Sequence, residues 1–309
     1  MSAKKRKGKI IPKLLPATAV SYWRYNPETR GIWSAMSRAA EEAANTKSWP
    51  DQCAVPTYVA YSVLKEYRGD KIARSLCSDL TAAWAWDKER IVYRFDYTLA
   101  SELIAQVDRY KNKVTLPEEL LSKLPHRCFF VETAVPIIES PGFFCWVDHI
   151  PEKEDVCIRL LLIKTKGAFN SAGYLSAAFR LTPERENVSA TKEYKPLDLP
   201  KSITNEDMQF NVIQEALQFV LYLLAANTEA SKPNGGVIFV GKSVGQKLRS
   251  NAKSYVRRAH WHHYWVGSEK RGDRRLELKW LPPIPVGKEE MVPRVVNVRG
   301  EDKNGKRSR

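Results

Sequence analysis

Apolar residues recur at helical spacing through most of the first ninety positions of the chain. A helix is predicted to start at Asn26-Pro27-Glu28, because an asparagine, a proline and an acid are typical of a helix start. It should run to about Ala44, with one apolar stripe formed by Ile32, Trp33, Met36, Ala40 and Ala43. The same period predicts helices over 57–67 and from Asp70 to Trp84. This part of the chain is therefore expected to be mainly helical.

The spacing of apolar residues changes near Arg90. A short strand is predicted over 91–95 and a short helix over 99–107. Pro117 is expected to open another helix, which ends near Pro125. Four runs rich in β-branched and aromatic residues follow, over 128–132, 143–148, 156–164 and 175–181. Their hairpin-like spacing favours an antiparallel or mixed sheet over a doubly wound one. The polar stretch 184–203 is predicted to be a loop.

A long helix is predicted from Asn205 to about Thr228, and a buried strand from Val237 to Val240. Together the patterns indicate an α+β protein with a helical N-terminal part, a central mixed or antiparallel sheet and a basic, aromatic, β-hairpin-like segment near the C-terminus. The expected regions are a disordered basic arm (1–16), a mainly helical region (17–125), an α+β core (126–245), the basic aromatic segment (246–286) and a disordered basic tail (287–309).

Composition narrows the class of protein. The chain has 309 residues, of which 43% are hydrophobic, enough to bury a core. Its five cysteines are widely spaced without a C-x-x-C pair, so they predict neither a disulfide framework nor a zinc knuckle, and they favour a reducing compartment. No apolar run approaches the roughly 18 residues of a membrane span, and the basic N-terminus does not resemble a secretory signal. A soluble cytoplasmic protein is expected.

The net charge of +15 is concentrated at the two ends of the chain. Residues 1–30 contain eight basic residues and one acid, and residues 251–309 contain fifteen basic residues and seven acids, while the remainder is balanced. Clustered lysine and arginine gain affinity by releasing counterions from a phosphate backbone, which favours RNA or another anionic partner. The alternative is that the first dozen residues form only a solubilising arm.

Residues 255–280 contain three of the five histidines and three of the nine tryptophans. In an extended segment His260, His262 and Tyr264 would face one way, and Trp261, His263 and Trp265 the other. Arginine donates forked hydrogen bonds to phosphate, and aromatic rings stack on unpaired bases. The candidate nucleic-acid or partner surface consists of Arg257, Arg258, His260, Trp261, His262, Tyr264 and Trp265, with Lys279 and Trp280 in support. A purely structural hairpin, with its tryptophans in the core, is the alternative.

Two catalytic interpretations of the same segment are open. His260 and His262 beside Arg257 or Arg258 would provide a base, an acid and a cation for metal-independent cleavage of RNA. The same two histidines would hold a metal only if the fold brought Asp148, His149 or Asp273 close, and no cysteine partner or HExxH motif accompanies them. No metal and no cofactor are therefore predicted.

A phosphate-loop pattern also occurs, with Gly236, Gly241, Lys242 and Ser243 at the required spacing. In a phosphate loop the variable residues form the loop itself, whereas Val237–Val240 is typical of a strand. The match is interpreted as a coincidence.

The run R-R-x-H-W-H-x-Y-W-x-G from Arg257 to Gly267, followed by Lys279-Trp280, resembles the C-terminal signature of the second type V-A anti-CRISPR inhibitor family. Weaker similarity extends through 67–69, 124–125, 128–132 and 142–143. The resemblance implies a protein of a mobile element that acts in the cytoplasm of a bacterial host. Members of this family reduce production of the type V-A RNA-guided nuclease.

The implied mechanism is recognition of the nuclease's nascent polypeptide together with a lowered level of its messenger RNA. The implied partners are that polypeptide, or another host protein, and RNA or the ribosome. A ribonuclease or a general RNA-binding protein is the alternative function.

Overall fold

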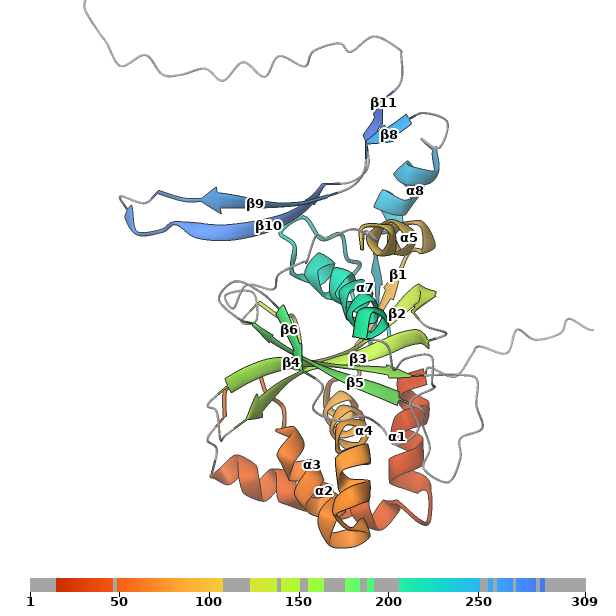
Figure 1. Cartoon of the computed structure of the whole chain (residues 1–309), viewed down its shortest axis with the longest axis vertical. Coiled ribbons are helices and arrows are strands. Elements are labelled where there is room, and N and C mark those ends of the chain that lie inside the picture. The colour runs from red at the N-terminus through yellow and green to blue at the C-terminus, as the bar shows by residue number, and fades with distance from the viewer. Residues whose placement is uncertain are drawn as a thin grey trace, which may run out of the picture.

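The computed structural model describes residues 15–46, 49–107, 123–137, 140–150, 155–163, 176–183, 188–191, 206–250, 255–257, 260–268, 271–281 and 284–286. A seven-stranded mixed sheet lies between two layers of helices (Figure 1). The predicted tail 287–309, residues 1–14 of the predicted arm and most of the helix predicted from Pro117 lie outside the described residues.

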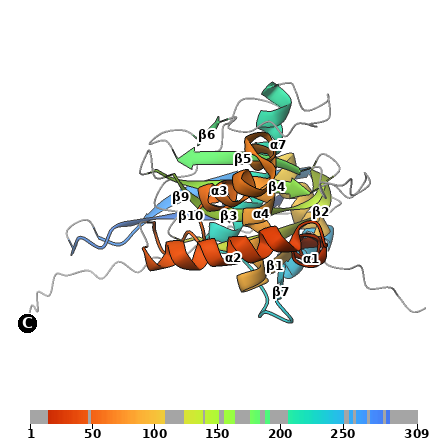
Figure 2. The ribbon, with the colours of Figure 1, turned by 90° about the horizontal axis from the view of Figure 1, so that it is seen from below.

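One helical layer is formed by α1 (Leu15–Tyr25), α2 (Arg30–Asn45), α3 (Thr57–Arg68) and α4 (Asp70–Glu89). Figure 2 shows the molecule from the side of this layer, with α2 running across it. The predicted helices are confirmed, and α2 buries the predicted stripe residues Ile32, Trp33, Met36 and Ala40. It begins later than predicted because Asn26 closes a separate turn, in which its side chain accepts from the Glu28 amide at 3.0 Å.

The strands follow the order β6-β5-β4-β3-β2-β1-β7. From β2 onward, each strand to β6 pairs antiparallel with the next, whereas β1 lies parallel to both β2 and β7. The strands are β1 (Val92–Phe95), β2 (Cys128–Ile137), β3 (Ser140–Ile150), β4 (Asp155–Ile163), β5 (Ser176–Pro183), β6 (Val188–Thr191) and β7 (Val237–Val240). The predicted α+β class with a mixed sheet is confirmed.

The prediction of a loop throughout 184–203 was wrong at β6, which pairs with the edge of β5. Its four residues, Val-Ser-Ala-Thr, include little apolar surface and are too few to produce a period. Its pairing with β5, and not its own sequence pattern, makes this segment a strand.

Successive side chains of the inner strands enter two different cores. Phe129 and Phe143 face α5 (Tyr97–Ala105) and α7 (Glu206–Leu224), where the ring of Phe143 lies 6.3 Å from that of Phe219. Phe130 and Phe144 face α1–α4, with ring centroids 5.0 Å apart. Because both faces are covered, these strands have continuous apolar runs in place of an alternating pattern.

The close approach of β2 and β3 requires a residue without a side chain at Gly142. A Cβ atom there would lie 2.3 Å from the carbonyl oxygen of Val131 and 2.7 Å from the ring of Phe130. Any larger residue would therefore force the two strands apart.

All five cysteines fall within the described part of the chain, where they are buried and none forms a disulfide. Among the helices that the structure describes, none is both long enough and apolar enough for a membrane crossing.

A buried ion pair connects the sheet to the first helical layer. Arg159 of β4 donates to Asp148 of β3, and the two side chains are only 6% and 1% exposed. The second carboxylate oxygen of Asp148 accepts from the backbone amide of Thr57, the first residue of α3, at 2.7 Å. Asp148 therefore neutralises a buried guanidinium and also satisfies one of the unpaired amides at a helix start.

Substituting Asp148→Asn should lower the free energy of unfolding by about 3–5 kcal/mol, because it removes the carboxylate charge that neutralises the buried Arg159 guanidinium. Denaturant unfolding of the two proteins measures the difference. The matched control is Asp70→Asn, which removes an exposed ion pair with Arg74 and should leave the midpoint close to that of the wild type. Equal midpoints for wild type and Asp148→Asn would contradict the assigned role of the ion pair.

Candidate functional site

The predicted basic aromatic segment contains a β-hairpin. Strands β9 (His260–Val266) and β10 (Arg275–Leu281) pair antiparallel, with Trp261 opposite Trp280 and His263 opposite Leu278. The hairpin is separate from the central sheet and projects beyond it (Figure 1). A second small pair, β8 (Tyr255–Arg257) with β11 (Ile284–Val286), flanks its base. The predicted hairpin-like segment is confirmed.

One face of the hairpin is packed against α7. Trp280 and Leu278 are 1% and 3% exposed, and the Trp280 ring meets Tyr222 edge to face at 5.5 Å. The half-buried Trp261 packs beside them, and its indole nitrogen donates to the side-chain oxygen of Gln218 at 2.7 Å. These contacts make the base of the hairpin part of the protein core.

The backbone of β10 is also held by the turn that follows α7. The Ala226 amide donates to the Leu278 carbonyl at 2.9 Å. The side chain of Asn227 donates to the Trp280 carbonyl at 2.6 Å and accepts from the Trp280 amide at 3.0 Å. One side-chain amide thereby replaces a strand partner and fixes the position of β10 on α7.

The opposite face presents an aromatic and cationic cluster to solvent. The exposed imidazole of His262 stacks on the ring of Tyr264, with centroids 4.3 Å apart and planes inclined at 30°. From β10, the ammonium group of Lys279 lies 5.1 Å from the centre of the Tyr264 ring. We call His262, Tyr264 and Lys279 the outer-face cluster. Glu277 of β10 lies opposite Tyr264 in the register, so this face carries one acid beside the cation. The stacked rings and the ammonium group suit an unpaired base next to its phosphate.

The other sequence candidates have different locations. Trp280 lies in the core, so its side chain supports the hairpin and does not line its outer face. His260 and Trp265 are positions of β9, and Arg257 is a position of β8. Arg258 lies outside the described residues.

The described residues contain no group of three histidine, cysteine, aspartate or glutamate side chains able to hold a metal ion. Asp148 is engaged with Arg159 in the core, and the side chain of Asp273 accepts from the Ser268 amide in the hairpin turn.

The segment with the phosphate-loop pattern has a different structure from a phosphate loop. Residues 237–240 form β7, and Gly241, with φ of 73°, leads directly into α8 (Lys242–Ser250), a helix that was not predicted. The amides of Ser243 and Val244 donate to the carboxylate of Glu229 at 2.9–3.1 Å. A side-chain carboxylate therefore caps the helix start, where a true phosphate loop would hold its ligand.

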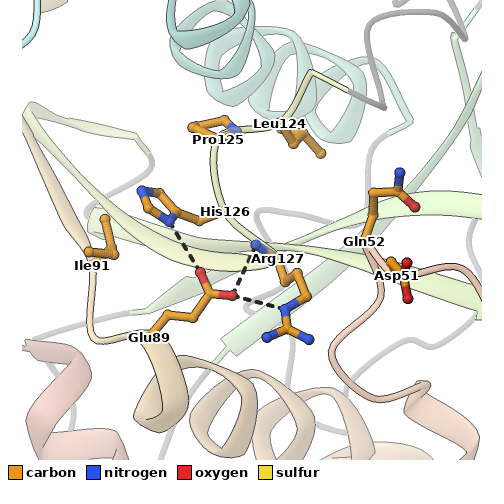
Figure 3. A pocket seen from close by; sticks show the side chains of 8 residues that line it. All are labelled: Asp51, Gln52, Glu89, Ile91, Leu124, Pro125, His126 and Arg127. Atoms are coloured by element: carbon orange, nitrogen blue, oxygen red, sulfur yellow. Dashed lines mark hydrogen bonds and ion pairs between the residues drawn. The ribbon is translucent and has the colours of Figure 1, made fainter.

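A hollow of about 580 Å³ lies where α4 ends and β2 begins (Figure 3). At its wall Glu89 accepts from the amide and the guanidinium of Arg127 at 3.3 and 3.1 Å, and His126 lies 3.3 Å from its other oxygen. Burial raises the pKa of Glu89, but the hydrogen bonds from His126 and Arg127 outweigh it and the net pKa is lowered. The positive charge of Arg127 and the negative charge of Glu89 in this wall therefore largely offset each other.

Sequence patterns did not identify Gln218 and Asn227, which hold the hairpin. Gln218 is fully buried, and a polar residue within the apolar face of the predicted helix 205–228 was the available signal. Asn227 offered no such signal, because its role depends on the distant backbone of Trp280.

A family model described as AcrVA2-like, the anti-CRISPR type V subtype A2 family, matches residues 93–288. This chain belongs to that family. The matched residues extend from β1 through the hairpin to the residues after β11. Among curated protein sequences none matches this chain.

The crystal structure of AcrVA2 has the same fold as this AcrVA2-like protein. The two superpose with a TM-score of 0.60 over 88% of this chain and 98% of the other, at 16% sequence identity. The similarity therefore spans both helical layers and the sheet, although few residues are shared.

Substituting Trp280→Ala should lower the free energy of unfolding by about 3–5 kcal/mol, because it opens a cavity between the hairpin and α7. The substitution Tyr264→Ala removes a ring from the outer face and should cost less than about 1 kcal/mol. Denaturant unfolding of both variants tests the assignment of the two faces. Similar losses for the two substitutions would mean that the hairpin is not packed through Trp280.

The lowered pKa of Glu89 also predicts a pH dependence. Folding favours its ionised form, so the stabilisation should be present above its ordinary pKa of about 4.5 and be lost as the pH falls through the lower folded value. The Glu89→Gln variant should therefore be less stable than wild type at pH 7, with a smaller difference near pH 3. Unfolding free energies measured across this range provide the test, and a constant difference would refute it.

Proposed function

We propose that this AcrVA2-like protein suppresses the biogenesis of a type V-A RNA-guided nuclease in the bacterial cytoplasm. It recognises the nascent nuclease polypeptide, lowers the level of its messenger RNA and contacts RNA through the outer-face cluster of the hairpin. Membership of the anti-CRISPR family supports the class of target. The described geometry supports the contact with RNA.

The observation that carries this proposal is the stacked pair of His262 and Tyr264 with Lys279 beside it. Base stacking on one aromatic side chain contributes about 1–3 kcal/mol. A neighbouring ammonium group adds attraction for phosphate that weakens as the salt concentration rises. The buried side of the hairpin holds these groups on a rigid support, so little side-chain freedom is lost on binding.

The positive ends of the sequence fit the same role. Residues 251–309 alone carry fifteen basic residues against seven acids. Such an excess raises the rate and the affinity of encounter with RNA without selecting a sequence. Selection of one message would then come from the nascent polypeptide, which identifies the gene being translated.

The first test compares nuclease messenger RNA and protein in cells that express a type V-A nuclease. Wild type should lower both, whereas the Tyr264→Ala/Lys279→Gln variant should lose most of the repression, since it lacks the stacking ring and the charge. The matched control, Tyr97→Ala/Lys232→Gln, removes the same groups from exposed positions outside the hairpin and should repress normally.

Purified proteins separate a failure to bind RNA from other causes. The hairpin variant should bind single-stranded RNA at least about fivefold more weakly than the control, the equivalent of about 1 kcal/mol. Full repression by a folded hairpin variant would refute the RNA contact. Absence of repression by wild type would refute the nuclease as target and indicate another host protein. Cleavage of RNA with turnover would establish the ribonuclease alternative.

A further inference from the structure

A second hollow lies in the helical layer on the other side of the sheet from the hairpin. It has a volume of about 650 Å³ and is formed where α1 ends and α2 begins. Arg24 and Tyr25 line it from α1, and Arg30 and Ser37 line it from α2. We call it the elbow pocket. It lies outside residues 93–288, the part of the chain that the family model matches.

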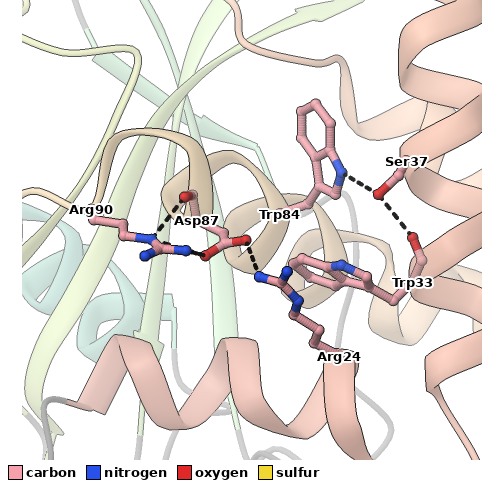
Figure 4. A network of polar contacts seen from close by, with 6 residues as sticks. All are labelled: Arg24, Trp33, Ser37, Trp84, Asp87 and Arg90. Carbon is pink, nitrogen blue, oxygen red and sulfur yellow. Dashed lines mark hydrogen bonds and ion pairs between the residues drawn. The ribbon is translucent and has the colours of Figure 1, made fainter.

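The elbow pocket has an excess of positive charge. Asp87 of α4 accepts from Arg24 at 3.2 Å and from Arg90 at 2.7 Å, so one carboxylate serves two guanidinium groups (Figure 4). Both arginines stay partly in solvent, with side chains 42% and 63% exposed. No acidic residue in the described part of the chain pairs with Arg30, which is exposed on α2. Guanidinium donors therefore remain available to an anion.

The wall of the elbow pocket is rigid. Ser37 accepts from the indole nitrogen of Trp84 at 3.2 Å and donates to the carbonyl of Trp33 at 3.2 Å, which ties α2 to α4 (Figure 4). Trp33 and Trp84 are themselves buried. The arginines are thus presented from helices that are held in place by the core, and the site needs little rearrangement to bind.

An aromatic ring lies beside the charges. Tyr25 is 68% exposed, more than the intermediate burial typical of a tyrosine, and the guanidinium of Arg24 lies 5.6 Å from the centre of its ring. An exposed ring next to forked donors is the combination that binds a nucleotide, since the donors take the phosphate and the ring takes the base. An acidic peptide would use the arginines but would leave Tyr25 without a role.

We propose that the elbow pocket binds a nucleotide, with Arg24 and Arg30 donating to its phosphate and Tyr25 stacking on its base. The nucleotide is either free or part of an RNA strand. This site is independent of the outer-face cluster, because it lies on the opposite helical layer and shares no residue with it. The nucleotide site can therefore be tested separately, and its outcome does not depend on the proposed function of the hairpin.

The experiment uses the full chain with the Tyr264→Ala substitution, so that binding by the hairpin is reduced throughout. Affinities for adenosine triphosphate and for an oligouridylate of about 12 nucleotides are measured by calorimetry and fluorescence anisotropy over a range of salt concentrations. The test variants are Arg24→Gln/Arg30→Gln and Tyr25→Ala. The matched control, Arg38→Gln/Lys71→Gln, loses the same two charges from exposed positions of α2 and α4 outside the pocket.

The arginine variant should bind at least about tenfold more weakly than the control. For the oligouridylate, the slope of log affinity against log salt should decrease in magnitude by about 1.4 if two phosphate contacts are lost. Tyr25→Ala leaves the Arg24 ion pair with Asp87 in place and should weaken binding about fivefold or more. It provides a second measurement if the arginine variant folds poorly.

Weaker binding of both ligands would indicate a site for the nucleotide itself, and weaker binding of the oligouridylate alone would indicate a site for an RNA strand. Either result supports the proposal. Equal affinities for control and pocket variants would overturn it. Binding of an acidic peptide that depends on Arg24 and Arg30, without binding of either nucleotide ligand, would also overturn it and assign the pocket to protein.

Discussion

The architecture depends on the burial of both faces of the central strands. Strands β2, β3 and β4 alternate large apolar side chains into two cores, so each face requires its own layer of helices. The N-terminal helices cover one face, and α5 and α7 cover the other. Phe219 of α7 meets Phe95 and Phe143 edge to face at 4.9 and 6.3 Å, which fixes this helix on the sheet. The hairpin is positioned in turn by α7, through Tyr222 and Trp280.

The outer-face cluster and the elbow pocket have the same chemistry although they are built from different elements. Each places a cation beside an aromatic ring that is at least partly open to solvent, and each is held by tryptophans that are buried behind it. In the hairpin the ring and the cation come from neighbouring strands. In the elbow pocket Arg24 and Tyr25 come from the end of α1, and Arg30 comes from the start of α2. Two such surfaces on opposite layers would let one molecule contact separated parts of a long anionic partner, with an affinity greater than either surface alone provides.

Local periodicity was enough to predict most of the elements. The stripe of α2, the strand β7 and the aromatic hairpin were all evident, because their signals repeat within a few residues. The prediction that 237–240 is buried was wrong, since β7 is an edge strand and Phe239 is 44% exposed. The position of β1 between β2 and β7 was not predictable in this way, since strands distant in sequence select one another through the whole fold. The short strand β6 was missed because its four residues contain no apolar period, and the short helix α8 was missed because its apolar pair, Val244 and Leu248, covers a single turn.

The candidate sites, like the secondary-structure elements, were predictable from the sequence only in part. The sequence indicated that the hairpin has two unlike faces, but aromatic residues occur on both, so Trp280 was grouped with surface residues although it lies in the core. The elbow pocket depends on Arg24 and Asp87, which are 63 positions apart and have no pattern in common. Sites of this kind are detected only when the fold has brought their parts together.

The place of β1 in the sheet also determines when the protein can complete its fold. Residues 92–94 pair on one side with 130–132, and residues 92–95 pair on the other with 237–240, so the sheet cannot close until most of the chain has been synthesised. The helices α1–α4 contact one another locally and are able to form much earlier. Until β3 is in place, Trp86 of α4 lacks its contact with the Phe144 ring, and the apolar residues around it have only part of their final cover. The helical layer of a newly made chain therefore exposes apolar surface until the strands are synthesised, and such exposed surface favours aggregation.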